Sequence, residues 1–340
     1  MSSKAGTLPR RDTTFSGRAT SVEWPTVALG VLILGLYVAV TLGHRHLPAV
    51  ALIVALAVIS GWWSSFQHEV IHGHPFPWER VNEVAGSFAM SLLIPFRVYK
   101  SQHLRHHRDT LLTDPFEDPE SFYCDAERWR RANVIVRSVM WANRTFVGRM
   151  IIGPPIALVR FLGSEYTRLR RRDGTAWGDW SAHLAWFAIT CVWAFGIAGV
   201  PVWEYVVGSV WFGTSVIQIR SFAEHLWQPD SSDRTAFVDG FFPFGLLFLF
   251  NNMHNTHHAR PTVPWYQLPR LADRLGSRAA ADLGAGYYKG YREVIRLYGV
   301  KPFCVPVHPS TPEGSELLAE RYVAAPGTVS PGLLRIRGTR

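Results

Sequence analysis

The first candidate for chemistry is the stretch HEVIHGH at residues 68–74, which contains the pattern H-E-x-x-H. On a helix this spacing places His68 and His72 on one face, where both imidazoles can bind one metal ion. In zinc peptidases the glutamate of this pattern acts as a general base, a role that would fall to Glu69. Whether such hydrolytic chemistry applies depends on the other histidines of the chain.

Two further clusters and one single histidine occur later in the chain. HLRHH at 103–107 and HNTHH at 254–258 share the pattern H-x-x-H-H, and a single histidine lies in RSFAEHLWQP at 220–229. Residues i, i+3 and i+4 share one face of a helix, so each H-x-x-H-H can direct three imidazoles to one side. The nine candidate ligands are His68, His72, His103, His106, His107, His225, His254, His257 and His258.

Nine imidazoles exceed the needs of one zinc ion, which takes three protein ligands in a catalytic site and four in a structural one. They suit two metal ions with four or five ligands each, and imidazole is a good ligand for zinc, copper, iron and nickel. His74 follows His72 by about 200° around a helix and faces away unless the helix ends at Gly73. Pro75, which directly follows His74, favours such an end of the helix.

Carboxylates are expected beside these rings, because neutral imidazoles leave the metal charge uncompensated and need partners that orient them. Glu69 and Glu224 are adjacent in sequence to predicted ligands and are the strongest candidates. In a two-metal site Glu69 would orient a ligand instead of acting as a base. Other acids that flank the clusters are Asp109, Asp114, Glu117, Asp118 and Glu120.

Four apolar segments are long enough to cross a hydrocarbon core of roughly 30 Å. They form two close pairs, 26–43 with 50–66 and 182–200 with 202–219. The chain has a net charge of +9, and its bases gather before the first span and between the second and third. By the positive-inside rule the N-terminus, this link and the C-terminal third lie on the cytoplasmic side, together with every histidine cluster. We predict an all-α integral membrane protein with four transmembrane helices in two hairpins and a cytoplasmic helical cap that holds a di-metal site.

The remaining segments complete the predicted organisation: a polar basic segment at 1–23, a membrane domain at 24–299 and a loosely ordered tail at 300–340, rich in Pro, Gly and Ser. The Arg-rich stretch 126–176 is predicted to form membrane-surface helices that include a docking face for an acidic electron carrier. Basic clusters beside transmembrane helices indicate topology and lipid contact, so no nucleic-acid partner is expected. The three cysteines have no C-x-x-C spacing, which argues against a disulfide framework or a cysteine metal site.

The ordered boxes HEVIH, HLRHH and HNTHH resemble those of the membrane-bound fatty-acid desaturase and hydroxylase superfamily. The stretch HNTHHARPTVPWYQLP is similar to the third box of that superfamily with its proline-rich turn, and RSFAEH is similar to the segment that supplies an additional histidine. The resemblance covers about residues 26–270. It implies a non-haem centre of two iron ions, held by the nine histidines at the cytoplasmic face of four transmembrane helices.

The resemblance also implies the reaction and its partners: O2 as co-substrate, electrons from a separate ferredoxin-, rubredoxin- or cytochrome-type protein, and attack on an unactivated C–H bond of an apolar substrate in the bilayer. Some relatives place a water-holding asparagine near the single histidine, where this chain has Ser221. Asn251, Asn252 and Asn255 are the alternatives, and Asn252 is kept as the candidate.

Several functions are compatible with the pattern. Fatty-acyl desaturation comes first, and the alternative in the same superfamily is a hydroxylase or ketolase of a hydrocarbon, carotenoid or other small substrate. A zinc intramembrane protease built on HEVIH would bind one zinc ion and would not need the other clusters. A metal-transport protein would need ionisable ligands along the spans, which contain almost none.

Overall fold

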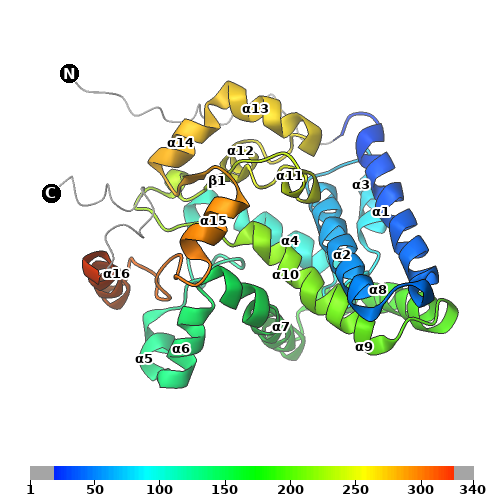
Figure 1. Cartoon of the computed structure of the whole chain (residues 1–340), viewed down its shortest axis with the longest axis horizontal. Helices are drawn as coiled ribbons and strands as arrows, with labels where there is room; N and C mark the ends of the chain where they lie inside the picture. Colours follow the sequence, from blue (N-terminus) through cyan, green and yellow to red (C-terminus); the bar gives the residue numbers. More distant parts are fainter. Residues whose placement is uncertain (1–18, 325–340) are drawn as a thin grey trace. The chain divides into compact units, whose positions relative to one another are not determined.

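The computed structural model describes residues 19–324 and is built almost entirely from helices (Figure 1). Two compact units make up this part of the chain. The first, here called the span unit, comprises residues 19–102 and 150–219. The second, here called the histidine unit, comprises residues 103–149 and 220–324. The N-terminal segment predicted at 1–23 falls largely outside the described residues.

The span unit contains the long apolar helices. Its elements are α1 (Trp24–Leu42), η1 (His44–His46), α2 (Ala49–Ile71), α3 (Glu79–Gly86), most of α4 (Phe96–His106), most of α7 (Phe146–Arg170), α8 (Gly174–Cys191), the π-helical segment η3 (Val192–Ile197), α9 (Val202–Tyr205), the π-helical segment η4 (Val206–Phe212) and most of α10 (Gly213–Ser221). Proline and glycine set the first boundaries: Pro25 lies in the first turn of α1, Gly43 follows its last residue, and Pro48 precedes α2. Proline is favoured there because the first N–H groups of a helix have no intrahelical partner.

Four helical segments are long and apolar enough to cross a membrane, namely Trp24–Leu42, Ala49–Ile71, Phe146–Arg170 and Gly174–Ile197. The first two coincide with the predicted spans 26–43 and 50–66, and the last overlaps 182–200. The third lies in the Arg-rich stretch 126–176, where membrane-surface helices are predicted. Arg149, Arg160 and the Pro154–Pro155 pair dilute the apolar character of that helix, which explains why its sequence looks less like a span. The arrangement in two hairpins with a cytoplasmic cap stays a prediction.

The predicted span 202–219 is helical, but it is not among the four long apolar helices. This run packs along α2 inside the span unit, and small residues permit the close approach. A Cβ atom at Gly208 would lie 2.9 Å from the carbonyl oxygen of Ile53, and one at Gly61 would lie 2.3 Å from the side chain of Val216.

Polar side chains on the same run are bonded within the span unit. The hydroxyl of Tyr205 donates to the carbonyl oxygen of Met90 at 2.8 Å, and the hydroxyl of Ser209 donates to the same oxygen at 3.0 Å. The Tyr205 hydroxyl also lies 3.1 Å from that of Tyr37 on α1. These hydroxyl groups lower the mean hydropathy of the run. They are tolerated inside the span unit because each of them forms a hydrogen bond to a neighbouring segment.

The histidine unit is made of short helices with one small sheet. Its elements are the last turn of α4, η2 (Asp109–Leu111), α5 (Ala126–Arg131), α6 (Val134–Ala142), the start of α7, η5 (Ser231–Asp233), β1 (Phe237–Val238), α11 (Phe244–Leu247), α12 (His254–Ala259), η6 (Trp265–Gln267), α13 (Leu268–Leu275), α14 (Ser277–Leu283), β2 (Tyr287–Tyr288), α15 (Tyr291–Tyr298) and α16 (Pro312–Ala324). The strands are parallel and pair Phe237 with Tyr287. Phe237, Phe250, Met253 and Leu268 form a core cluster next to α12.

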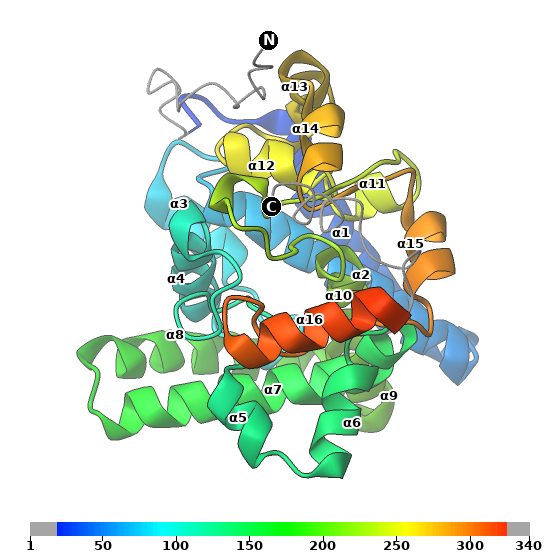
Figure 2. The same ribbon diagram turned by 90° about the vertical axis from the view of Figure 1, so that its left-hand side faces the viewer.

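The C-terminal segment is more regular than the loosely ordered tail that the composition predicts. Phe303, Val305 and Val307 are buried, and α16 follows. Figure 2 shows α16 beside α5, and Arg130 of α5 forms a 3.5 Å ion pair with Glu313 of α16. Residues 303–307 are thus held in place by burial, although the composition of the predicted tail is rich in Pro, Gly and Ser. The remainder of the predicted tail, 325–340, falls outside the described residues.

Candidate metal centre

Four buried histidines converge in the histidine unit from three elements. His106 lies at the end of α4, His225 follows α10, and His254 and His258 lie on α12. One ring nitrogen of each lies within 4.8 Å of those of the other three. Nε2 of His225 is 3.0 Å from Nε2 of His106 and 2.9 Å from Nε2 of His254. Residues separated by more than 100 positions therefore direct their imidazoles to one point.

A second set in the same unit contains His103, His107 and His257. Nε2 of His107 is 3.0 Å from Nε2 of His103 and 3.1 Å from Nε2 of His257. His103 and His257 are buried and His107 is half-buried. The two H-x-x-H-H boxes thus contribute to both sets, because His106 and His258 belong to the first one.

The geometry fits metal ions. The Nε2 atoms in each set lie 2.9–3.1 Å from one another along a row of three, so several nitrogen atoms that can each supply a lone pair point to one place. A cation at the centre of each set would accept all of these lone pairs. Imidazole is also a preferred ligand of first-row transition metals. The donor sets therefore suit two such ions.

Carboxylates bind the far side of the rings on α4. Nδ1 of His103 is 2.7 Å from Oε1 of Glu120, and Nδ1 of His106 is 2.8 Å from Oδ1 of Asp118. Each carboxylate accepts the Nδ1 proton of its ring, so Nε2 is the nitrogen that faces the cluster. This carboxylate–histidine arrangement fixes the tautomer and orientation of metal ligands in other proteins.

The third box is held by β1 and the loop before α12. The Asn252 amide donates to the carbonyl oxygen of Val238 at 2.7 Å, and the Asn255 backbone N–H donates to that of Ala236 at 3.0 Å. Nδ1 of His254 lies 3.2 Å from both Oδ1 of Asn251 and Oε1 of Glu224. The small sheet thus positions α12, whose six residues are too few to be stable alone.

Burial sets the protonation of this cluster. Desolvation lowers the pKa of His225 and of His254 well below the usual value, and neighbouring histidines lower it further. Burial alone would also lower the pKa of His106, but the carboxylates of Glu120 and Asp118 raise it to about 9. His225 and His254 are therefore neutral near pH 7, as metal ligands must be. The raised pKa of His106 favours a positive charge on this ring, which a metal ion would displace as a proton when it binds.

The residues predicted to support the metal ligands in and near the histidine unit, Glu224, Asn252 and Asp109, have different surroundings. Glu224 contacts His254, and it also accepts a hydrogen bond from Arg220 at 2.8 Å. Asn252 binds backbone, so the neighbouring Asn251 is the asparagine that contacts a histidine. The side chain of Asp109 falls outside the described part of the structure.

The acids that orient the α4 histidines, Asp118 and Glu120, are two of five flanking acids in the sequence. The sequence pattern does not distinguish them as partners of particular histidines. The available signal was their place in the run DPFEDPE at 114–120, directly after the second box. A loop has no period from which distances can be predicted, so only the structure distinguishes them from Asp114 and Glu117.

The H-E-x-x-H residues belong to the span unit. α2 continues five residues beyond the predicted span and carries His68, while His72 follows its last residue. Both are buried, and their ring centroids are 4.8 Å apart. Oε1 of buried Glu69 lies 3.9 Å from Nδ1 of His68. Nδ1 of His74 lies 2.9 Å from Oε1 of Glu23, so this ring has a carboxylate partner within its own unit.

The model of the family described as fatty acid desaturase matches residues 45–291, a range that includes all the histidine clusters. The chain belongs to this family. A beta-carotene ketolase from Paracoccus sp. (strain N81106 / MBIC 01143) is 25% identical over 279 residues, which cover 78% of this chain and 96% of the ketolase. The family and this relative identify the chain as an oxidoreductase of the desaturase and hydroxylase type.

Proposed function

We propose that this desaturase-family protein is an O2-dependent membrane oxidoreductase with two non-haem iron ions, which attacks an unactivated C–H bond of an apolar substrate. A fatty-acyl chain is the first candidate substrate, and desaturation is the first candidate reaction. The observation that carries the proposal is the convergence of seven imidazoles in two sets within the histidine unit. Family membership supports iron over the other metals that imidazole binds.

The first iron would be held by the four-histidine set around His225, and the second by the set around His107. We assign His68 and His72 to the second iron on the basis of the H-E-x-x-H pattern. When bound, the two ions supply the redox chemistry with O2 that amino-acid side chains lack.

The side chains of this protein would orient the ligands and exclude water. Asp118 and Glu120 hold the Nδ1 protons of His106 and His103, so the rings need no reorganisation when they bind an ion. Burial of the four-histidine set keeps bulk water away from a reactive centre.

The bilayer and a redox protein are the proposed partners. Four helices long and apolar enough to span a membrane support an integral membrane location, from which an apolar substrate would enter. We place the metal centre on the cytoplasmic side, because bases gather in the segments that carry the histidine clusters. Electrons would come from a separate ferredoxin-, rubredoxin- or cytochrome-type protein.

A carotenoid is the second candidate substrate, and oxidation of a ring carbon to a hydroxyl or ketone group is the second candidate reaction. The observation that favours it is the similarity to beta-carotene ketolase along 96% of that protein. Both substrates are long and apolar, and both reactions begin with the oxidation of a C–H bond.

Product analysis in whole cells tests the proposal and separates the substrates. The chain would be expressed in bacterial cells with and without a carotenoid pathway, and lipids and pigments would be compared by mass spectrometry with those of a His107→Ala strain. A new double bond in fatty acids supports desaturation, and a carotenoid mass increased by oxygen supports the second candidate. Unchanged lipids and pigments in both hosts would contradict the proposal for both substrates.

Metal counting tests the proposed centre against the zinc-protease alternative. Purified wild-type protein should contain two iron ions per chain, and His106→Ala and His257→Ala should each lose metal. A protease built on HEVIH would contain one zinc ion and would keep it in both variants.

A further inference from the structure

Asp118 joins a loop to a candidate ligand. Its Oδ1 accepts hydrogen bonds from Nδ1 of His106 at 2.8 Å and from the backbone N–H of Glu120 at 2.9 Å. Its Oδ2 accepts the backbone N–H of Thr113 at 2.8 Å. The side chain is buried, with 3% of the residue exposed. The position of the carboxylate therefore depends on how residues 113–120 are held.

Thr113 is the other fixed point of this loop. Its φ angle is +71°, a conformation that costs free energy for a β-branched residue and needs support from its surroundings. Its carbonyl oxygen accepts a hydrogen bond from the hydroxyl of Ser121 at 2.7 Å, and its own hydroxyl oxygen lies 3.2 Å from Nε2 of His308. A residue almost 200 positions away thus contacts the loop that orients His106.

The tautomer of His308 follows from its second contact. The backbone N–H of Ser310 donates to Nδ1 of His308 at 3.3 Å, and the Ser310 hydroxyl, 2.7 Å from the same nitrogen, can donate to it as well, which favours the tautomer with the proton on Nε2. Nε2–H therefore donates to the Thr113 hydroxyl. The ring is 5% exposed and packs against Tyr123 and Trp227, with centroids 5.2 and 6.1 Å apart.

Residues 303–310, here called the strap, are attached to the rest of the histidine unit through their backbone. The N–H of Cys124 donates to the carbonyl oxygen of Pro306 at 2.9 Å, and the N–H of His308 donates to that of Cys124 at 3.1 Å. The N–H of Phe303 donates to the carbonyl oxygen of Arg144 at 2.7 Å. These bonds fix the place from which His308 reaches Thr113.

We propose that the strap positions the second histidine box through the sequence His308, Thr113, Asp118 and His106. The inference rests on the proposed function, since it takes His106 as a metal ligand. His308 and Thr113 are positioning residues, because they act on the ligand through Asp118. The C-terminal segment of the chain would thereby set the geometry of the first metal site.

Titration with Co²⁺ tests the strap on purified full-length protein. The absorption of Co²⁺ in the visible range reports both its affinity and its coordination geometry. We expect His308→Ala to weaken Co²⁺ binding about tenfold and to change the spectrum. This is the low end of the roughly 10- to 100-fold range for mutation of residues that support a metal ligand. His308→Gln should restore most of both, since its amide can donate to the Thr113 hydroxyl.

Two further variants isolate the contact. Thr113→Val removes the hydroxyl with little change in volume and should weaken Co²⁺ binding as His308→Ala does, whereas Thr113→Ser should bind as wild type. If His308→Ala does not fold, Thr113→Val decides. His183→Ala removes a buried imidazole of the span unit that bonds to the carbonyl oxygen of Leu92, and it should leave affinity and spectrum unchanged.

The outcomes separate the strap from the proposed function. Wild-type affinity and spectrum in both His308→Ala and Thr113→Val would overturn the strap and leave the metal centre intact. Wild-type protein that binds no Co²⁺ would overturn both. A loss in His183→Ala equal to that in His308→Ala would mean that metal binding responds to general destabilisation, which also overturns the strap.

Discussion

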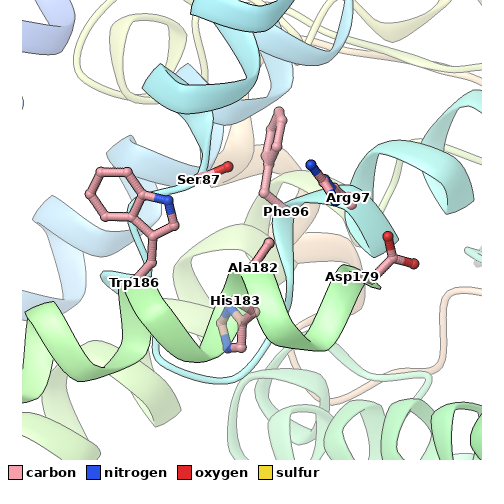
Figure 3. Close-up of a pocket in the computed structure, with 7 residues that line it drawn as sticks. All are labelled: Ser87, Phe96, Arg97, Asp179, Ala182, His183 and Trp186. Atoms are coloured by element: carbon pink, nitrogen blue, oxygen red, sulfur yellow. The ribbon is translucent and has the colours of Figure 1, made fainter. Parts of the chain in front are cut away.

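His183 in the span unit and His106 in the histidine unit are both buried imidazoles, but their partners differ. Nε2 of His183 donates to the carbonyl oxygen of Leu92 at 2.8 Å, and the ring, drawn on α8 in Figure 3, lies near Trp180 and Phe187 with centroids 5.8 and 6.5 Å apart. His106 donates to the Asp118 carboxylate and directs Nε2 toward Nε2 of His225. A neutral acceptor and aromatic neighbours satisfy a structural histidine, whereas a carboxylate behind the ring and other imidazoles in front prepare it for a cation.

The strongest test of this comparison removes each ring. His106→Ala should lose metal and lower product formation by more than about 100-fold. This exceeds the range for residues that only hydrogen-bond a metal ligand, because the variant removes the ligand itself. His183→Ala should retain both metal ions in whatever fraction of the protein folds. Metal analysis and product assays on the purified variants make the measurement. Equal metal loss in the two variants would contradict the distinction.

Removal of the carboxylate should have a smaller effect. Asp118→Ala leaves the His106 ring without its acceptor, and metal affinity should fall by roughly 10- to 100-fold. Asp179→Ala is the matched control, since Asp179 forms a 3.0 Å ion pair with Arg168 in the span unit and does not contact a histidine cluster in the described chain. Competition with a chelator measures both affinities. An Asp118→Ala protein with wild-type affinity would show that burial alone orients the ring.

A third test uses the pH dependence of stability at His308. Burial, followed by the charge of Arg234, lowers the pKa of His308 from 6.5 to about 4. Between these values the unfolded chain binds more protons, so the contribution of His308 is fully present above pH 6.5 and is lost as pH falls toward 4. Wild type should lose about 2 kcal/mol more than His308→Gln between pH 7.5 and 5, at 1.36 kcal/mol per pKa unit. Thermal unfolding in detergent at both pH values measures the difference, and parallel losses would contradict it.

The smallest expected effect concerns the structural histidine itself. His183→Gln keeps an N–H donor for the Leu92 carbonyl, whereas His183→Ala leaves that buried acceptor without its partner. The alanine variant should be less stable than the glutamine variant by about 1–3 kcal/mol, at equal metal content. Unfolding midpoints compared with metal content check both statements, and any difference in metal content would make His183 more than structural.

The same contrast shows what could be predicted from the sequence. The three boxes were recognisable because H-x-x-H-H and H-E-x-x-H have a helical period, and α1 and α2 were recognisable as uninterrupted apolar runs. Asp118 and Asn251 were not selected, because a loop brings them to their histidines and loops have no period. Helix α7 was not predicted as a span because Arg149, Arg160 and two prolines interrupt its apolar sequence. The run at 202–219, which was predicted as a span, is helical but is not among the helices of the described chain that are long and apolar enough to cross a membrane.

The length of helix α2 has a consequence for the position of His68. It runs without interruption from Ala49 to Ile71, about 34 Å at 1.5 Å per residue, and carries His68 in its last turn. A rod of this length that leans by about 5° moves its end sideways by about 3 Å, more than the length of a metal–nitrogen bond of about 2 Å. Lipids of a different thickness change the lean of such rods. Under the proposed function, the fatty acids that surround this protein would therefore act on the geometry of its H-E-x-x-H imidazoles, and through them on its own rate.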